Sequence, residues 1–383
     1  MPARVVVLGA GYAGTTVVKR LERLSNDHDV TWVSKDDYHL VLHEVHRVIS
    51  DPAAESKLTV PLSTVAAPST NVVQGTVVGV DTDERTVSLA DESTLTYDYL
   101  VVALGSQTAF YGIPGLKEHA LTLKSLAEAR TIHETVVEAA TQASTDDPVQ
   151  VAVGGAGFSG VQTAGELAEL RDERDLPIEI SLVEAMDEVM PGNDPVFQRT
   201  VREKIEDRGI TVLTADPIVE ATEDTILFDQ GEPLQYDAFV WTGGITGQDA
   251  LDGVNLDNNH NRVETDATFR TSDERVFAVG DSALIEQGSD VAPPTAQAAW
   301  QAGEVLADNL VRTIDGNPLE TWTFTDKGTV VSIGDVAVAN DVMGVPIDTF
   351  DGLPAKMLKK AIAARWLKDV SSYRRAISAW GSL

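Results

Sequence analysis

Cysteine is absent from all 383 residues of the sequence. Disulfide bonds, zinc–thiolate sites and redox-active thiols are therefore excluded, because each of them needs a cysteine sulfur. No stretch approaches the ~18 consecutive apolar residues that suggest a membrane-spanning helix. The chain also begins without the apolar segment of a signal peptide. We therefore expect a cytoplasmic protein with no transmembrane helix.

Basic residues are scarce. Lys and Arg number 29 against 60 Asp and Glu, which gives a formal charge of −31. This balance argues against a nucleic-acid partner, because phosphate binding needs a basic surface. Repulsion between so many like charges destabilises a compact fold in dilute buffer, but molar salt shortens the Debye length to about 3 Å. The composition therefore predicts a halophilic protein.

Two units of strand, glycine turn and helix are present, at residues 4–24 and 151–170. Each contains G-x-G-x-x-G between an apolar strand and a helix, the arrangement that grips a dinucleotide pyrophosphate. The first glycine makes the turn, the second lets the backbone approach the phosphates, and the third lets the helix pack on the strand. The glycines are Gly9, Gly11 and Gly14 in the first unit, and Gly155, Gly157 and Gly160 in the second.

The residue that closes the second strand differs between the two units. In dinucleotide-binding folds an acid at this position, about 20 residues after the glycines, binds the ribose hydroxyl. Glu184 occupies it in the second unit, and Ser34 occupies it in the first. A carboxylate accepts a hydrogen bond from the 2′-hydroxyl and repels a 2′-phosphate. Glu184 therefore predicts a preference for NADH over NADPH.

Further motifs extend this pattern along nearly the whole chain. YDYLVVALGS follows the first glycine turn, and VWTGGI, VFAVGD and AQAAWQ follow the second. In this order the motifs resemble flavoproteins with two dinucleotide-binding domains, and within them type II NADH dehydrogenases, the single-subunit NADH:quinone oxidoreductases. Relatives in that superfamily that act through cysteines are excluded by the composition.

The resemblance implies an α/β fold with two Rossmann-like domains, one for FAD and one for NADH. A small C-terminal α+β region that ends in an amphipathic helix would complete it. The expected domains are a discontinuous FAD-binding domain (1–112 and 247–320), an NADH-binding domain (113–246), and a C-terminal region for membrane association or dimerisation (321–383).

The resemblance also implies the binding residues. Non-covalent FAD would be held by Gly9, Gly11, Tyr12, Ala13, Gly14, Ser34, Lys35, Val78, Ala103, Gly105, Gly280, Asp281, Gln297 and Ala298. NADH would be held by Gly155, Gly157, Phe158, Ser159, Gly160, Glu184, Gly243 and Gly244.

Gln297 and Gln301 match the family signature associated with quinone binding. Their i, i+4 spacing puts them on one helix face, and Pro293, Pro294 and Thr295 mark the start of that helix. Their amides can donate to quinone carbonyls without changing charge. We expect a menaquinone-type quinone as acceptor.

Gln162 stands where the family pattern has an acid near the nicotinamide and the quinone, so we include it among the catalytic candidates. An amide forms hydrogen bonds but cannot relay a proton. Glu166, one turn further on, could take over this role, although a structural role is favoured for it. Packing is also favoured over catalysis for His39 and His43. We expect no metal site, because no cluster has suitable spacing.

The C-terminal segment 353–383 reverses the charge of the rest, with seven basic residues and one acidic residue. Apolar residues spaced by three and four predict one amphipathic helix over 353–380, with a basic border. Such a helix is typical of binding to an anionic membrane surface, here the cytoplasmic face of the cell membrane. A homodimer contact is the alternative. The apolar stripe consists of Leu358, Ile362, Trp366, Val370, Tyr373, Ile377 and Trp380.

Two other functions remain open from the sequence. The chain could be an NADH-dependent reductase of a soluble electron carrier, although two acidic proteins would repel each other outside high salt. It could also be a flavin-bearing redox sensor with little turnover, which the departures at Ser34 and Gln162 favour.

Overall fold

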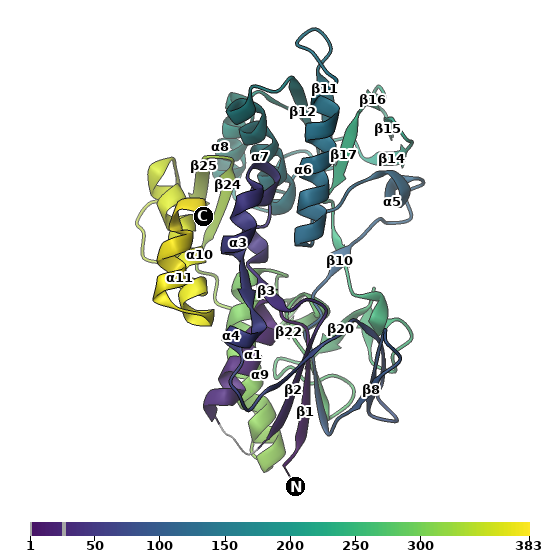
Figure 1. Cartoon of the computed structure of the whole chain (residues 1–383), viewed down its shortest axis with the longest axis vertical. Coiled ribbons are helices and arrows are strands. Elements are labelled where there is room, and N and C mark those ends of the chain that lie inside the picture. Colours follow the sequence, from purple (N-terminus) through teal and green to yellow (C-terminus); the bar gives the residue numbers. More distant parts are fainter. Residues whose placement is uncertain (1, 25–27) are drawn as a thin grey trace. The chain divides into compact units, whose positions relative to one another are not determined.

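The computed structural model describes residues 2–24 and 28–383 (Figure 1). The chain divides into two compact units. Unit 1 comprises Met1–Leu40, Thr59–Gln107 and Ile245–Asp326, and unit 2 comprises Val41–Leu58, Thr108–Gly244 and Lys327–Leu383. The units differ from the three domains expected from the sequence, because residues 41–58 and most of the C-terminal region group with the second glycine turn.

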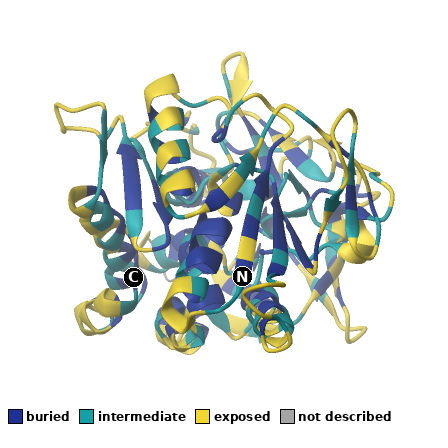
Figure 2. Ribbon diagram, turned by 90° about the horizontal axis from the view of Figure 1, so that it is seen from above, coloured by how far each residue is buried: buried dark blue, intermediate teal, exposed yellow. Residues whose placement is uncertain are grey.

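Unit 1 is built on a parallel sheet of five strands in the order β21-β9-β1-β2-β5. Its central strands are almost wholly apolar and buried, as expected for a parallel sheet covered on both faces. Figure 2 shows buried residues in dark blue on inner strands and helix faces, with exposed residues in yellow on loops and outer helix faces. The strands are β1 (Arg4–Leu8), β2 (Asp29–Ser34), β5 (Asn71–Gln74), β9 (Tyr99–Val102) and β21 (Val276–Ala278).

Two helices of unit 1 pack against each other, α1 (Tyr12–Leu24) and α9 (Ala296–Asp315). β5 pairs in parallel with β2 and so belongs to the five-stranded sheet, whereas the next three strands form a separate antiparallel meander. The meander itself is β6 (Val77–Asp81), β7 (Thr86–Leu89) and β8 (Thr94–Thr96).

Shorter elements complete unit 1. They are β3 (Tyr38–Leu40), β4 (Thr59–Pro61), α4 (Leu62–Val65), β18 (Ile245–Thr246), η3 (Asp249–Leu251), β19 (Asn258–Asn259), β20 (Arg262–Thr265), η4 (Gly280–Ser282), β22 (Ala283–Gln287) and β23 (Asp290–Val291). The boundary between unit 1 and unit 2 falls within β10 (Gln107–Thr108), because Gln107 belongs to unit 1 and Thr108 to unit 2.

Unit 2 repeats the design with four parallel strands in the order β13-β12-β11-β17. The two parallel sheets confirm the α/β fold with two Rossmann-like parts. The strands are β11 (Val149–Gly154), β12 (Ile178–Val183), β13 (Ile210–Leu213) and β17 (Ala238–Trp241), and the longer helices are α6 (Leu126–Ala140), α7 (Phe158–Arg174) and α8 (Pro195–Asp207).

Unit 2 also contains two antiparallel sheets, β14-β15-β16 and β24-β25-β26. The first is formed between β13 and β17 of the chain, and the second comes from the C-terminal part and contacts α7 through β24. Their strands are β14 (Ile218–Ala221), β15 (Thr225–Phe228), β16 (Leu234–Gln235), β24 (Thr329–Ile333), β25 (Val336–Asn340) and β26 (Thr349–Asp351). The short helices are η1 (Leu42–Glu44), α2 (Arg47–Ser50), η2 (Pro52–Ala54), α3 (Glu55–Leu58) and α5 (Leu116–His119).

The C-terminal segment is not the single helix that the sequence predicts. α10 (Leu353–Val370) ends at a pair of serines, and α11 (Tyr373–Ala379) and η5 (Trp380–Ser382) follow. Ser372 is extended and its hydroxyl accepts from the backbone N–H of Arg375 at 3.3 Å, so it caps a new helix. Among the described residues, no helix is both long and apolar enough to cross a membrane.

The predicted apolar stripe is therefore divided. Trp366 and Val370 are buried in unit 2, whereas Tyr373 and Ile377 are 71% and 74% exposed. The break between the helices changes which side of the segment faces solvent, so one helical period cannot describe both parts.

Candidate active site

The first glycine turn lies between β1 and α1. Gly9 has a φ of +101°, and a Cβ there would clash with the backbone carbonyl of Ala103. A Cβ on Gly14 would likewise clash with the carbonyl of Gly9. A Cβ on Gly11 would meet nothing within 4 Å, so the backbone is open at the one glycine that must approach a pyrophosphate. The turn therefore fits a dinucleotide.

Side chains of unit 1 support this turn from behind. Trp32 Nε1 donates to the carbonyl of Gly9 at 2.9 Å. His39 is fully buried, with Nδ1 2.7 Å from the carbonyl oxygen of Ala10 and 3.2 Å from Thr15 Oγ1. The ring of Tyr12 meets His39 edge-on, with centroids 5.4 Å apart. His39 thus has the packing role favoured by the sequence.

A second turn of unit 1 contains Asp281. Gly280 has a φ of +71°, and Asp281 Oδ2 accepts from Ser106 Oγ at 2.9 Å. Ser282 Oγ donates to the carbonyl of Gly105 at 3.1 Å. Arg262 donates to the carbonyl of Asp281 at 2.8 Å, so the peptide carrying the acid is fixed. The structure thus brings together Gly105, Gly280 and Asp281, three of the residues that the sequence assigns to FAD.

The second glycine turn, between β11 and α7, has the same construction. Gly155 has a φ of +89°, and a Cβ there would lie 2.7 Å from the Cα of Gly243. A Cβ on Gly160 would clash with the carbonyl of Gly155, whereas one on Gly157 would meet nothing within 4 Å. Phe158 and Ser159, in the first turn of α7, are exposed. This turn also fits a pyrophosphate.

Glu184 completes the second site. The residue is 9% exposed, and its carboxylate accepts from the backbone N–H of Ala156 at 2.7 Å and of Met186 at 2.9 Å. The acid is thereby fixed at the end of β12 beside the glycine turn. Gly243 and Gly244 lie across that turn, where Tyr111 donates to the carbonyl of Gly243 at 3.3 Å.

Gln297 and Gln301 share one face of α9, as their spacing predicts. Gln301 Nε2 donates to the carbonyl of Thr325 at 2.9 Å, and Gln301 Oε1 accepts from the N–H of Thr325 at 3.3 Å. Gln297 Nε2 lies 3.4 Å from Asp326 Oδ1. Both amides therefore hold the segment after Phe324. Thr295 caps α9 by accepting from the N–H of Ala298 at 3.1 Å.

Gln162 lies on α7 in a buried ionic cluster of unit 2. The orientation that satisfies its amide has Oε1 accepting from Lys359 Nζ at 2.6 Å and Nε2 donating to the carbonyl of Phe158 at 3.3 Å. Lys359 Nζ lies 3.0 Å from Glu44 Oε1. Arg47 Nε donates to Glu44 Oε2 at 2.6 Å. The cluster comprises Glu44, His46, Arg47, Ser50, Gln162, Glu166, Ser332 and Lys359.

Burial sets the protonation of this cluster. Burial alone would raise the pKa of Glu44, but the charges of Lys359 and Arg47 outweigh it and hold that pKa well below its usual range. Burial lowers the pKa of His43 to about 4 and the pKa of His46 well below its ordinary value. Both histidines are therefore neutral at pH 7. Burial raises the pKa of Glu166, against the pull of Arg47.

Two of the predicted flavin ligands are exposed. Lys35 is exposed just after β2, and Val78 is 53% exposed on β6, in another sheet.

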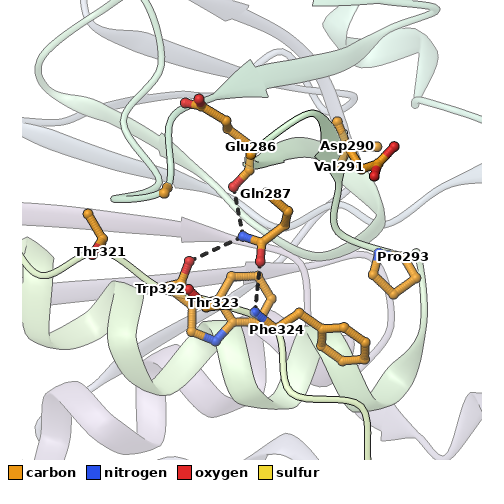
Figure 3. Close-up of a pocket in the computed structure, with 11 residues that line it drawn as sticks. Glu286, Gln287, Asp290, Val291, Pro293, Thr321, Trp322, Thr323 and Phe324 are labelled. Atoms are coloured by element: carbon orange, nitrogen blue, oxygen red, sulfur yellow. Dashed lines mark hydrogen bonds between the residues drawn. The ribbon is translucent and has the colours of Figure 1, made fainter.

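A pocket of about 490 Å³ lies in unit 1 (Figure 3). Within the described chain, its lining includes none of the residues predicted to bind FAD, NADH or the quinone. Its central amide, Gln287, is held by Glu286, Trp322 and Phe324. No cluster suited to a metal occurs among the described residues.

Known proteins share this geometry. The family model "Pyridine nucleotide-disulphide oxidoreductase" matches residues 3–303, which defines the chain as an oxidoreductase of the two-dinucleotide class. The type II NADH:quinone oxidoreductase of Staphylococcus aureus is 31% identical over 388 residues, covering 94% of both chains. The chain therefore belongs to the type II NADH:quinone oxidoreductases.

Solved structures agree on the fold. NDH2 from Plasmodium falciparum in complex with NADH superposes with a TM-score of 0.87 at 17% identity, covering 99% of this chain and 98% of that one. The sulfide:quinone oxidoreductase of Aquifex aeolicus superposes with a TM-score of 0.80 at 18% identity, covering 97% and 92%.

Sequence reasoning found only Gln162 and Glu166 of the buried cluster and missed six members, among them the charged residues Glu44, Arg47 and Lys359. Glu44 and Arg47 stand three residues apart, which is ordinary for a surface helix, and Lys359 is one of several bases in its segment. The only sequence signal was the unusual run HEVHR at residues 43–47, which places four ionisable side chains next to buried Val41 and Val45.

Proposed function

We propose that this chain binds FAD non-covalently at the first glycine turn and uses it to transfer electrons from NADH to a menaquinone-type quinone. The observation that carries the proposal is the pair of glycine turns, each closed by steric contacts at its outer glycines and open at Gly11 and Gly157. One bound dinucleotide stays and the other is exchanged. FAD supplies the chemistry that links a two-electron hydride donor to a quinone.

The residues then have distinct tasks. Glu184 selects NADH, because a fixed carboxylate accepts from a 2′-hydroxyl and repels a 2′-phosphate. Asp281, fixed by Ser106, faces the ribityl and phosphate part of FAD. Gln297 and Gln301 orient the quinone, which requires them to exchange their hydrogen bonds with residues 325–326 for bonds to its carbonyls.

The C-terminal helices provide access to a lipid-soluble substrate. Their exposed apolar side chains stand among basic residues, the combination that binds an anionic membrane surface. Attachment would thus be peripheral, on the cytoplasmic face, with a homodimer contact as the competing use of residues 353–380. The exposed apolar set is Leu353, Met357, Ile362, Tyr373, Ile377 and Trp380, and its basic neighbours are Lys356, Lys360, Arg365 and Arg374.

Charge composition supports a halophilic setting. A net charge of −31 repels itself at low ionic strength, and screening at molar salt removes this cost. Unfolding should therefore shift to higher temperature as KCl is raised. A melting temperature that stays constant or falls between 0.1 and 2 M KCl, concentrations that span about 10 to 2 Å of screening length, would reject this part of the proposal.

The main test is an absorbance spectrum followed by turnover. Protein purified in high salt should carry flavin absorbance that NADH bleaches, and a menaquinone analogue should restore it and sustain NADH oxidation. Flavin that NADH does not bleach would favour a sensor, and bleaching with transfer only to a soluble carrier would favour a carrier reductase. Activity no higher than that of free flavin would reject the proposal.

Membrane binding needs a substitution instead of a deletion, because Trp366 and Lys359 are buried and removing residues 353–383 would open unit 2. Tyr373→Glu with Ile377→Glu changes two side chains that are 71% and 74% exposed. We expect at least a tenfold loss of binding to phosphatidylglycerol vesicles, with NADH-dependent reduction of a soluble dye unchanged. Unchanged vesicle binding would point to a homodimer contact.

A further inference from the structure

The buried ionic cluster of unit 2 contains a carboxylate close to the position where the family pattern has its acid. That pattern places an acid at position 162, and this chain has glutamine there. We propose that Glu44 supplies the missing negative charge and holds Lys359 against the amide of Gln162. Glu44 and Lys359 are thus positioning residues for Gln162. The inference rests on the proposed function, in which Gln162 lies beside the reacting substrates.

Lys359 is the link between the two positions. Its side chain comes from α10, is 3% exposed, and reaches Glu44 Oε1 at 3.0 Å and Gln162 Oε1 at 2.6 Å. An ammonium group buried to this degree is costly without an anion within contact distance. Gln162 offers only a neutral carbonyl oxygen. The anion that compensates the charge of Lys359 is therefore Glu44.

The balance of charges explains why the cluster needs Glu44 and does not need a glutamate at position 162 as well. Glu44 touches both cations, with Arg47 Nε at 2.6 Å and Lys359 Nζ at 3.0 Å. Glu166 lies 3.7 Å from Arg47 Nη1. Two cations thus face two carboxylates, while His43 and His46 stay neutral. A glutamate at position 162 would add an uncompensated third carboxylate, and loss of Glu44 would leave an excess cation.

Glu166 is the competing candidate for the missing charge, since it lies one turn from Gln162. Its carboxylate accepts from the hydroxyl of Ser50, and its nearest cation is Arg47. Burial raises its pKa, so it is the carboxylate of the pair that loses its charge first as the pH falls. Glu166 therefore adds only a second, longer contact to Arg47, whereas Lys359 has its carboxylate partner in Glu44.

A double-mutant cycle tests the inference. It compares Glu44→Gln, Gln162→Glu and the double variant of the FAD-loaded protein in high salt. Each single variant unbalances the cluster, and the melting temperature should fall by roughly 5–10 °C for Glu44→Gln and by less for Gln162→Glu, which keeps Glu44. The double variant moves the carboxylate to the other side of Lys359 and should recover at least half of the loss. Glu173→Gln, an exposed change on α7, is the control and should leave the melting temperature unchanged.

Kinetics separate positioning from a purely structural role. Glu44→Gln should lower kcat with the menaquinone analogue about tenfold and leave the KM for NADH within twofold, and the double variant should regain kcat. Reduction of ferricyanide, which takes up no proton, should change less than twofold in Glu44→Gln.

Two results would overturn the inference. The first is a fall in the melting temperature of the double variant that equals or exceeds the sum of the falls in the two single variants. The second is an equal loss of ferricyanide reduction and quinone reduction in Glu44→Gln. The stability cycle does not need activity, so it remains informative if the proposed function itself fails and no acceptor is reduced by the wild type.

Discussion

The glycine turns of the two units share one backbone design and differ in what stands at the end of the next strand. In both, side chains are excluded at the outer glycines by close backbone contacts, and space remains at Gly11 and Gly157. The strand that follows ends in Ser34 in unit 1 and in Glu184 in unit 2. Steric contacts thus dictate the turn, and we propose that the residue at the end of the strand selects the ligand.

Different side-chain hydrogen bonds stabilise the two turns. In unit 1 an indole, Trp32, donates to the carbonyl of Gly9, and the same position in unit 2 is the aliphatic Leu182. In unit 2 the carboxylate of Glu184 accepts from the N–H of Ala156 instead. A turn braced by packed protein groups suits a ligand that stays. A turn braced by the carboxylate that we propose to bind the ribose suits a ligand that exchanges.

The largest expected effect comes from filling the open position of each turn. Gly11→Ala and Gly157→Ala add a methyl group that meets no protein atom within 4 Å, so the fold should persist. Each methyl would occupy the space of a pyrophosphate and weaken its ligand at least ~100-fold, about 2.7 kcal/mol. Gly11→Ala should be purified without flavin absorbance. Gly157→Ala should keep its flavin and lose reduction by NADH.

These two variants control each other. Circular dichroism should give the same helix content for both, since the methyl groups are added at equivalent positions. If Gly157→Ala lost flavin and Gly11→Ala kept it, the assignment of the ligands to the two turns would be reversed.

A smaller effect is expected at the end of the second strand. Glu184→Ala would remove the charge-assisted acceptor of the ribose hydroxyl, worth roughly 1.5–3 kcal/mol, or about 10- to 100-fold in NADH affinity. The preference for NADH over NADPH should fall with it in steady-state assays. Asp187→Ala is a matched exposed control in the same loop and should change neither. An unaltered cofactor preference in Glu184→Ala would contradict the role of this acid.

The difference between the turns, Ser34 against Glu184, could be predicted from the sequence because it depends on local patterns. Gly9, Gly155 and Glu184 each follow a buried apolar strand, and the structure has those strands where the sequence predicts them. The ionic cluster was not accessible, because Glu44 and Lys359 are 315 positions apart and meet only through the packing of unit 2. The break at Ser372 was missed for a related reason. A three-to-four spacing can continue by chance across a new helix start.

A still smaller effect should follow when the brace of the first turn is removed. Trp32→Phe keeps an aromatic ring in the core and deletes the hydrogen bond to Gly9, which costs about 1 kcal/mol or more because a carbonyl is left unsatisfied. The melting temperature of the flavin-loaded protein should fall by a few degrees, and FAD should dissociate several times faster on dilution. Leu182→Met at the matching position of unit 2 should leave FAD release unchanged. Equal FAD release from both variants would show that the indole brace is not what retains the flavin.

The smallest effect is expected from giving unit 1 the acid that it lacks. Ser34 is 6% exposed, and its backbone carbonyl accepts from the N–H of Gly75 at 2.8 Å, so the strand end is already fixed. Ser34→Asp adds a ribose acceptor but also buries a charge, and these contributions oppose each other. FAD affinity, measured by fluorescence titration of the stripped protein, should therefore change by less than about fivefold, or ~1 kcal/mol. A large gain would show that the first turn is limited by its missing carboxylate, and that the packed brace of Trp32 and His39 does not compensate for it.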